Sequence, residues 1–159
     1  EKNPIDISKI KLIVLDFDGV LTDNLVETNA RGTETVKTSK SDSLALSNFR
    51  KKFPAIPFIV LSSEKNNSIL KRCQKLNLEC FQVDSDKKVF LDKYIAENKI
   101  DAKNVLYLGN DVNDLTSLQF VGYPVIVSNS DISLFKYNFR ILKSNGGNGA
   151  LKELLNLLK

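Results

Sequence analysis

Two aspartates separated by one residue and followed by glycine form the first stretch of the chain that could do chemistry. Asp16, Asp18 and Gly19 occur in KLIVLDFDGVLTD, residues 11–23. Glycine allows a sharp turn that brings both carboxylates around one small ligand, and a divalent cation would offset the repulsion between their like charges. An ordinary Asp-Gly turn is the competing interpretation. The polar groups that follow, beginning with Thr22, favour a ligand site over a plain turn.

The element that must position these aspartates is the apolar run before them. Residues 12–15 are aliphatic and partly β-branched with no polar alternation, which is typical of a strand covered on both faces of a parallel sheet. Asp16 then stands at the carboxyl end of that strand. Ligands of open α/β sheets bind at this edge, so the sequence predicts a site there.

The sequence Asp-Phe-Asp-Gly-Val-Leu-Thr resembles the first motif of the haloacid dehalogenase superfamily, in its phosphatase branch. The resemblance implies that Asp16 is the nucleophile and that Asp18 is the general acid and base. Chemistry is consistent with this division, because a carboxylate is already ionised at neutral pH, whereas a sugar alkoxide needs a proton in order to leave. Hard oxygen ligands together with phosphate favour Mg²⁺ as the cofactor.

A serine at a second strand end is the next candidate. A strand predicted over residues 57–61 ends before Ser62, and a helix predicted over residues 67–76 follows. Ser62 resembles the second motif, a Ser or Thr that holds the phosphoryl group, and free backbone N–H groups at a helix start favour an anion. A simple capping role is the alternative for a serine at such a position.

A lysine in the first turn of a predicted helix is the third candidate. The helix spans residues 86–98, with Ser85 or Asp86 as its N-cap, and Lys87 lies where a cation opposes the helix dipole. Something other than helix formation should therefore favour this lysine. The Ser-Asp-Lys sequence resembles the third motif, which implies that Lys87 pairs with the phosphate and the nucleophile, and Lys88 is the rival.

Acids also follow a further buried strand. The sequence Gly-Asn-Asp-Val-Asn-Asp, residues 109–114, resembles the fourth motif of the superfamily. A strand end that carries acids beside Asp16 is tolerable if a metal lies between them. We expect Asp111 to be a metal ligand together with Asp16 and Asp18, and Asp114 to support the loop or the lysine.

The pattern of the whole chain predicts one α/β domain over residues 1–159, with a doubly wound parallel sheet. The first helix should begin with Ser41 or Asp42 as its N-cap. Further strands are predicted over residues 80–83, 104–108 and 125–127, with a weaker indication of one more over 138–142, and further helices over 41–52 and 151–158.

Residues 24–38 fit a β-hairpin with Arg31 and Gly32 in its loop. Many members of the superfamily insert a large cap domain after the first motif, and this chain has no room for one. Without a cap the site is open to water. We therefore predict a homotetramer in which the hairpin of one subunit packs beside the active site of the next.

Composition places the chain among ordinary globular proteins. Its 159 residues are 42% hydrophobic and 26% charged, and no apolar run approaches the ~20 residues of a membrane span. We expect no membrane association, and no signal peptide is visible. The chain begins at Glu1 and contains no Met, which is typical of an excerpt or a trimmed chain.

Charge and cysteine content narrow the partners further. The net charge of +4 comes from scattered lysines without interleaved aromatic residues, so we expect an anionic small-molecule substrate and no nucleic acid. With no histidine and only Cys73 and Cys80, a zinc site is excluded and a reduced, cytoplasmic setting is favoured. Both cysteines are interpreted as small core residues.

Within the superfamily, the absent cap, the early hairpin and the sequence Gly-Gly-Asn-Gly-Ala at 146–150 resemble the phosphatases of eight- and nine-carbon 2-keto-3-deoxy sugar acids, which are homotetramers. Glu64, with Arg72 and Lys75 downstream, is similar to the nonulosonate (sialic acid or KDN type) 9-phosphate phosphatases. The octulosonate 8-phosphate phosphatases instead carry Arg in place of Glu64, and Arg-Asp-Gly where this chain has Ser-Asp-Ser at 41–43.

The predicted substrate-binding residues lie around the second motif. Arg72 and Lys75 are three apart on one helix face and could approach a substrate carboxylate, while Glu64 could accept hydrogen bonds from sugar hydroxyl or amide groups. An exposed basic helix is the alternative interpretation. Ser63 and Asp42 complete the predicted set.

The sequence thus predicts Mg²⁺-dependent hydrolysis of a nonulosonate 9-phosphate through an aspartyl-phosphate. Two alternatives stay open. One is a 3-deoxy-octulosonate 8-phosphate phosphatase. The other is a non-catalytic oligomerisation domain of a longer acylneuraminate cytidylyltransferase, since the phosphatase-like domain of some CMP-sialate synthetases is also similar.

Overall fold

A computed structural model describes residues 3–159. Its strands alternate with helices along most of the chain, as predicted, and short 3₁₀ helices (η) join several of them. In chain order the elements are η1 (Ile7–Lys9), β1 (Leu12–Asp16), β2 (Glu27–Thr28), β3 (Glu34–Thr35), α1 (Lys40–Lys52), β4 (Phe58–Ser62), α2 (Asn67–Lys75), β5 (Glu79–Gln82), α3 (Lys87–Glu97), η2 (Ala102–Asn104), β6 (Val105–Gly109), η3 (Val112–Asp114), α4 (Leu115–Phe120), β7 (Tyr123–Ile126), η4 (Ile132–Lys136), β8 (Arg140–Ile141) and α5 (Ala150–Leu157).

The main sheet has the strand order β5-β4-β1-β6-β7-β8, and every neighbouring pair is parallel. Strands β1, β4 and β6 are buried along their whole length, which explains why their sequences are apolar without alternation. From β1 the chain builds the sheet first to one side and then to the other. Strand β1 therefore lies at the topological switch point, where open α/β sheets bind ligands.

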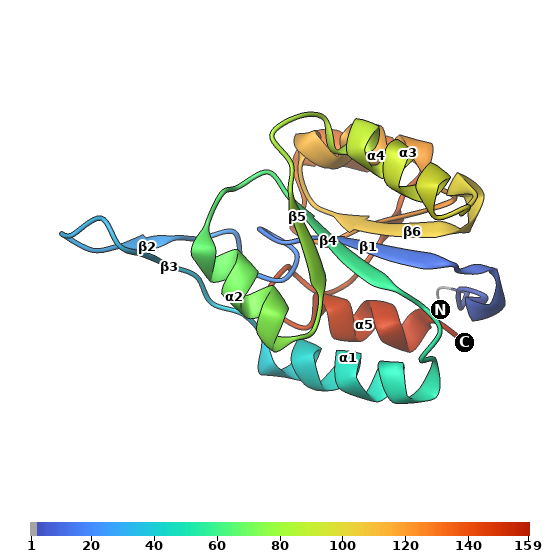
Figure 1. The fold of residues 1–159 in the computed structure, drawn as a ribbon, viewed down its shortest axis with the longest axis horizontal. Helices are drawn as coiled ribbons and strands as arrows, with labels where there is room; N and C mark the ends of the chain where they lie inside the picture. Colours follow the sequence, from blue (N-terminus) through green and yellow to red (C-terminus); the bar gives the residue numbers. More distant parts are fainter. Residues whose placement is uncertain (1–2) are drawn as a thin grey trace.

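Helices cover both faces of this sheet, so the predicted doubly wound α/β fold is confirmed (Figure 1). One core lies between the sheet and helices α1, α2 and α5, through residues such as Leu46, Ile69 and Leu154. The second core lies between the sheet and helices α3 and α4, through Leu91 and Leu118.

The predicted hairpin forms from the antiparallel strands β2 and β3 and projects away from the body of the molecule (Figure 1). All four strand residues are exposed. At its tip the Asn29 side chain accepts hydrogen bonds from the backbone N–H groups of Arg31 and Thr33. The hairpin thus has a defined turn but presents both faces of its strands to the surroundings.

One local prediction is wrong, and one helix was not predicted. Helix α1 has Ser39 as its N-cap, with the Ser39 hydroxyl accepting from the Asp42 N–H, so neither Ser41 nor Asp42 is the cap. Helix α4 was not predicted, because its six residues are too few to show a clear helical period. The weakly indicated last strand is present as β8.

The two ends of the described chain lie together (Figure 1). Ile5 donates a backbone hydrogen bond to Leu157 and accepts one from Lys159. Over residues 3–159, none of the helices has both the length and the apolar character needed to cross a lipid bilayer.

Candidate active site at the carboxyl end of strand β1

A polar cavity of about 310 Å³ opens at the carboxyl ends of β1, β4 and β6. The loops after these strands supply its walls, so residues far apart in sequence meet there, as the strand order requires. Its lining consists of Asp16, Asp18, Asn24, Ser63, Glu64, Asn110, Asp111 and Asn113.

Lys87 contacts two acids at this site and is almost fully buried. Its Nζ lies 2.8 Å from Asp16 Oδ1 and 2.8 Å from Asp114 Oδ1. Burial lowers the pKa of Lys87, but the carboxylates of Asp16 and Asp114 outweigh burial, so this pKa is raised and the ammonium stays charged. The rival Lys88 pairs instead with Asp92 on its own helix.

Asp114 holds the fourth-motif loop together, as predicted. Besides Lys87, its carboxylate accepts hydrogen bonds from the Tyr107 hydroxyl at 2.7 Å and from the backbone N–H groups of Asn110 and Asp111 at 2.9 and 3.3 Å. The sequence analysis missed Tyr107, whose position inside a buried strand is typical of a core aromatic residue.

Asp16 is 5% exposed, and one oxygen of its carboxylate faces two donors. Its Oδ1 accepts from the Phe17 N–H at 2.7 Å and from Lys87. Burial, and then the charge of Asp114, raise the pKa of Asp16 well above its usual range, while Lys87 acts in the opposite direction. Additional positive charge beside Asp16 would therefore favour the ionised form that a nucleophile needs.

Asp18 also lines the cavity and is half-buried. Burial raises the pKa of its carboxyl, and the charge of Glu64 raises it further, against the opposing effects of Lys87 and a Thr22 hydrogen bond. A carboxyl whose pKa is raised holds a proton closer to neutral pH. Asp16 and Asp18 thus have different electrostatic surroundings.

The side chain that contacts both motif-one aspartates from β6 is Asn110, which the sequence analysis did not single out. With its amide nitrogen toward them, Asn110 lies 2.9 Å from Asp16 Oδ2 and 3.0 Å from the Asp18 carbonyl oxygen. With its amide oxygen toward them, three oxygens converge on one point. Such a hard oxygen set fits a divalent cation such as Mg²⁺, which also keeps positions for water and phosphate.

Glycine is needed at position 19 for this contact. Gly19 has a φ of +82°, and a Cβ there would come within 1.9 Å of the Asn110 side chain. The Asp-Phe-Asp-Gly sequence therefore serves both the turn and the close approach of the fourth-motif loop.

Asp111 lines the same cavity but its carboxylate serves its own helix. Asp111 Oδ1 accepts from the Val112 N–H at 2.6 Å, and Asp111 is the N-cap of η3. Among residues 3–159, no three acidic, cysteine or histidine side chains are arranged to hold a metal by themselves. Asp16, Asp18 and Asp111 all line the cavity, and Asp111 Oδ1 also caps η3; their joint role as metal ligands stays a prediction.

The loop after β4 brings Ser63 and Glu64 to the cavity, as predicted. The Ser62 hydroxyl is buried and accepts from the Glu64 N–H at 3.1 Å, which shapes this loop. Ser63 Oγ accepts from the Asn113 amide at 3.3 Å across the cavity. A phosphoryl-binding role for Ser62 stays a prediction.

Three predicted substrate-binding residues lie elsewhere. Arg72 donates to the Ser39 carbonyl and the Ser43 hydroxyl, and Lys75 lines a separate surface hollow. Asp42 is 3% exposed, and its Oδ1 accepts from the Lys152 N–H at 2.9 Å at the start of α5. None of these side chains lines the polar cavity, and those of Arg72 and Asp42 instead join helices.

The glycine stretch at 146–149 packs directly on the first-motif loop. A Cβ on Gly146 would lie 1.8 Å from the Gly19 carbonyl oxygen, and the Gly147 N–H donates to the Val20 carbonyl at 2.9 Å. Gly149 is the N-cap of α5 and has no side chain to cap it, so Asp42 of α1 supplies the carboxylate. This stretch therefore supports the loop that carries Asp18.

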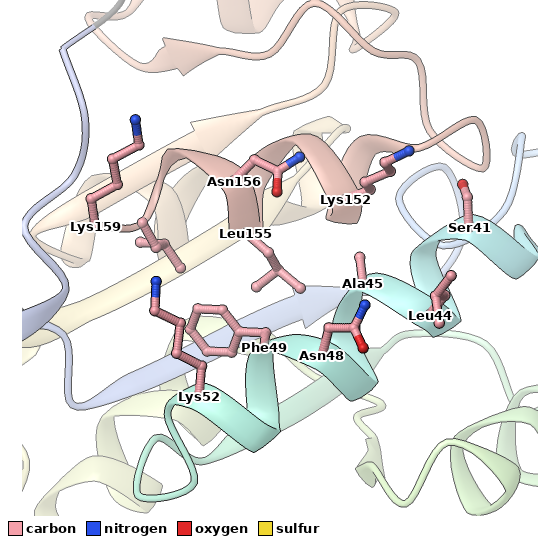
Figure 2. Close-up of a pocket in the computed structure, with 11 residues that line it drawn as sticks. Ser41, Leu44, Ala45, Asn48, Phe49, Lys52, Lys152, Leu155, Asn156 and Lys159 are labelled. Carbon is pink, nitrogen blue, oxygen red and sulfur yellow. The ribbon is translucent and has the colours of Figure 1, made fainter.

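Another hollow, of about 370 Å³, lies in the seam between α1 and α5 (Figure 2). Apolar side chains such as Phe49 and Leu155 form its floor, and Lys52, Lys152 and Lys159 stand around it. No acid is among the residues that line it. It lacks the paired carboxylates of the cavity at β1 and is not a rival for the chemistry.

Curated relatives match this chain over most of its length. The 3-deoxy-D-manno-octulosonate 8-phosphate phosphatase of Escherichia coli is 27% identical over 151 residues, which cover 94% of this chain and 79% of that protein. The enzyme of the same description from Salmonella typhi is 27% identical over 155 residues, with the same coverage.

Solved structures share the fold. A protein assigned to the HAD hydrolase family, from Streptomyces avermitilis, matches with a TM-score of 0.92 and 31% identity over 98% of this chain and 88% of that one. The octulosonate 8-phosphate phosphatase of Moraxella catarrhalis, solved with a magnesium ion, a phosphate ion and KDO, matches with a TM-score of 0.86 and 27% identity over 94% and 85%. Residues 41–154 match the haloacid dehalogenase-like hydrolase family, and the chain belongs to that family.

Proposed function

We propose that the chain is a Mg²⁺-dependent phosphomonoesterase that acts on a phosphorylated 2-keto-3-deoxy sugar acid through an aspartyl-phosphate on Asp16. The observation that carries this proposal is the pairing of Asp16 with Lys87, 2.8 Å apart, beside a second carboxyl whose pKa is raised. One aspartate is held beside a fixed cation, and the other is suited to hold a proton.

In the first step, an oxygen of the Asp16 carboxylate attacks phosphorus and forms an acyl-phosphate bond. The bond between phosphorus and the sugar oxygen breaks, and Asp18 gives its proton to that oxygen as it leaves. Lys87 keeps Asp16 oriented and offsets part of its negative charge. Tyr107 and the loop N–H groups hold Asp114, which in turn fixes Lys87.

In the second step, a water molecule attacks phosphorus of the aspartyl-phosphate. Asp18, now ionised, takes a proton from that water, and the bond between phosphorus and Asp16 breaks. Phosphate leaves, Asp16 is a carboxylate again, and Asp18 carries a proton as it did at the start. No further acid or base is required.

The residues suited to hold Mg²⁺ are Asp16 through Oδ2, Asp18 through its main-chain carbonyl, and Asn110 through its amide oxygen. When bound, the ion supplies positive charge that neutralises the phosphate and the paired carboxylates. Asn110 contributes no charge, so this donor set contains fewer negative charges than the predicted set with Asp111.

An octulosonate 8-phosphate is the favoured substrate, because the curated relatives named above act on that compound. Glu64 favours a second candidate, a nonulosonate 9-phosphate, since it lines the cavity at the position that distinguishes the two groups of phosphatases. The position of Arg72, bonded to Ser39 and Ser43, weakens the second candidate, because this arginine is not available in the cavity.

The test is phosphate release from a panel of sugar-acid phosphates of eight and nine carbons, with and without Mg²⁺. We expect turnover of one of these compounds only with the metal, and no comparable turnover of simple sugar phosphates. If no compound is hydrolysed although Mg²⁺ binds, the non-catalytic oligomerisation domain becomes the better description.

The proposal includes a homotetramer. The hairpin projects from the body, and Leu25 and Val26 at its base are 69% and 52% exposed, beside Asn24, which lines the cavity. A second subunit packed there would cover this apolar surface and would also close the cavity.

A further inference from the structure

Two cysteine side chains meet outside the catalytic site. Cys73 on α2 is 1% exposed, and Cys80 on β5 is partly exposed. Both thiols are free. They also line one surface hollow of about 540 Å³ together with Phe58, Leu70 and other residues.

The connection between α2 and β5 holds this pair in place. The Leu78 N–H donates to the Cys73 carbonyl at 2.9 Å, and Asn77 takes a φ of 50° to make the turn. In the sheet Cys80 is paired with Val60 of β4. Since the segment between the cysteines is short and ordered, bringing the two sulfur atoms together costs little chain entropy.

The thiols differ in their surroundings. Interaction with Cys73 lowers the pKa of the Cys80 thiol, although burial acts in the opposite direction, and interaction with Cys80 together with burial raises the pKa of Cys73. Cys80 is also the more exposed of the two. An accessible thiol of lowered pKa beside a second thiol is the usual arrangement of an oxidisable pair.

We propose that Cys73 and Cys80 form a dithiol that low-molecular-weight disulfides oxidise to an intramolecular disulfide, cross-linking helix α2 to strand β5. The Cys80 thiolate attacks one sulfur of the disulfide, forms a mixed disulfide and releases one thiolate. Cys73 then loses its proton and attacks the Cys80 sulfur, which releases the second thiolate. Two protein thiols are oxidised, and one disulfide is reduced to two thiols.

The cross-link would add a second connection between α2 and β5, which are already joined at the end that lies toward the catalytic cavity. There Lys65 pairs with Asp84 at 2.7 Å, and the Gln82 amide donates to the Asn66 carbonyl at 3.2 Å. The cysteines lie toward the other end of α2. Oxidation would therefore restrain α2 and β5 at both ends without using a residue of the catalytic cavity.

The test treats the reduced, folded protein with glutathione disulfide and then alkylates the remaining thiols. Trypsin cuts after Arg72 and Lys75, so it separates the two cysteines into peptides 73–75 and 76–87. We expect the wild type to lose both alkylatable thiols, to retain no glutathione, and to yield these two peptides joined by a bond that dithiothreitol breaks. The readout is mass and does not depend on the proposed phosphatase activity.

Single variants distinguish Cys80, which attacks the added disulfide first, from Cys73, which then attacks the mixed disulfide. Cys73→Ser should retain one glutathione on Cys80, because no second thiol displaces it, whereas Cys80→Ser should leave Cys73 unmodified in the folded protein. Cys73→Ala replaces Cys73→Ser if circular dichroism shows that the serine variant does not fold. A wild type that keeps glutathione on Cys80, keeps both thiols alkylatable, or links its cysteines only between molecules overturns the proposal.

Discussion

The side-chain amide of Asn110 lies 2.9 Å from Oδ2 of Asp16, whereas the neighbouring Asp111 directs its carboxylate to the N–H of Val112. The residue beside Asp16 on the fourth-motif loop is thus an amide and not an acid. An amide oxygen is a weaker cation ligand than a carboxylate, since it carries no net charge. The two side chains therefore give two alternative assignments for the metal ligand on this loop, Asn110 or Asp111.

Replacing Asn110 tests the metal site. Asn110→Ala removes one of three converging oxygens and should weaken Mg²⁺ binding about 10-fold or more, while Asn110→Asp adds charge and should strengthen it. Isothermal titration calorimetry with Mg²⁺ measures both. The matched control is Asp111→Ala, which should change Mg²⁺ affinity less than Asn110→Ala; the reverse order would restore Asp111 as the ligand.

Replacing Asp16, the proposed nucleophile, should abolish turnover. Asp16→Asn keeps the shape of the side chain but removes the attacking carboxylate, so phosphate release should fall on the order of 10⁴-fold. The fold should persist, because Lys87 keeps its contact with Asp114. Thermal unfolding of the variant provides the control, and substantial remaining activity in a folded variant would refute an aspartyl-phosphate on Asp16.

Stability without metal should fall as pH rises through the acidic range. The pKa values of Asp16 and Asp18 are raised in the folded protein, so the folded state keeps these protons to higher pH than the unfolded state does. Their favourable contribution is present below the ordinary value of 3.8 and is lost as pH rises through the raised values.

Mg²⁺ should reverse this loss, because a cation beside Asp16 favours its ionised form. The increase in melting temperature on adding Mg²⁺ should therefore grow between about pH 5 and pH 8. Thermal unfolding at a series of pH values measures it, with Asp16→Asn as the variant that lacks the main titrating group. An increase that is the same at every pH in the wild type would contradict the expectation.

Asp42 separates a substrate-binding role from a structural one. Asp42→Ala removes the carboxylate that accepts from the Lys152 N–H at the start of α5 and should destabilise the protein by about 0.5–2 kcal/mol. Asp42→Asn keeps an acceptor and should destabilise it less. Urea unfolding gives these values, and unchanged stability with a raised KM would instead support direct substrate contact.

The hairpin provides the test of assembly. Replacing residues 27–33 by a tight turn removes β2 and the tip of the hairpin, and should lower both the oligomer mass and the preference for one sugar-acid phosphate. Mg²⁺ affinity should be unchanged, since the cavity residues stay in place. Sedimentation velocity measures the mass. A wild type that is a fully active monomer at micromolar concentration would show that the predicted tetramer is wrong.

Local rules in the sequence were enough to predict the framework. Uninterrupted apolar runs predicted β1, β4 and β6, because strands buried on both faces have no polar alternation. Lys87 could be predicted because a lysine at a helix start conflicts with the helix dipole and because its Ser-Asp-Lys sequence resembles the third motif. The structure places it against Asp16.

Contacts between distant segments could not be predicted in the same way. Tyr107 has the pattern of a core residue until Asp114 is found against its hydroxyl. Arg72 and Asp42 have charges that suit a ligand, yet their partners are Ser39, Ser43 and the first turn of α5. No local pattern shows which charged side chain faces a cavity and which joins two helices.

The contact of Gly146 and Gly147 with the first-motif loop also concerns the order in which the chain is made. Ribosomal synthesis delivers Asp16 and Asp18 early, and every acid of the cavity has emerged by the time Asp114 does. The segment that packs on their loop follows all of these acids in the chain. A nascent chain therefore carries its carboxylates before it can hold them in place, and the site can form only after residues 146 and 147 have been made.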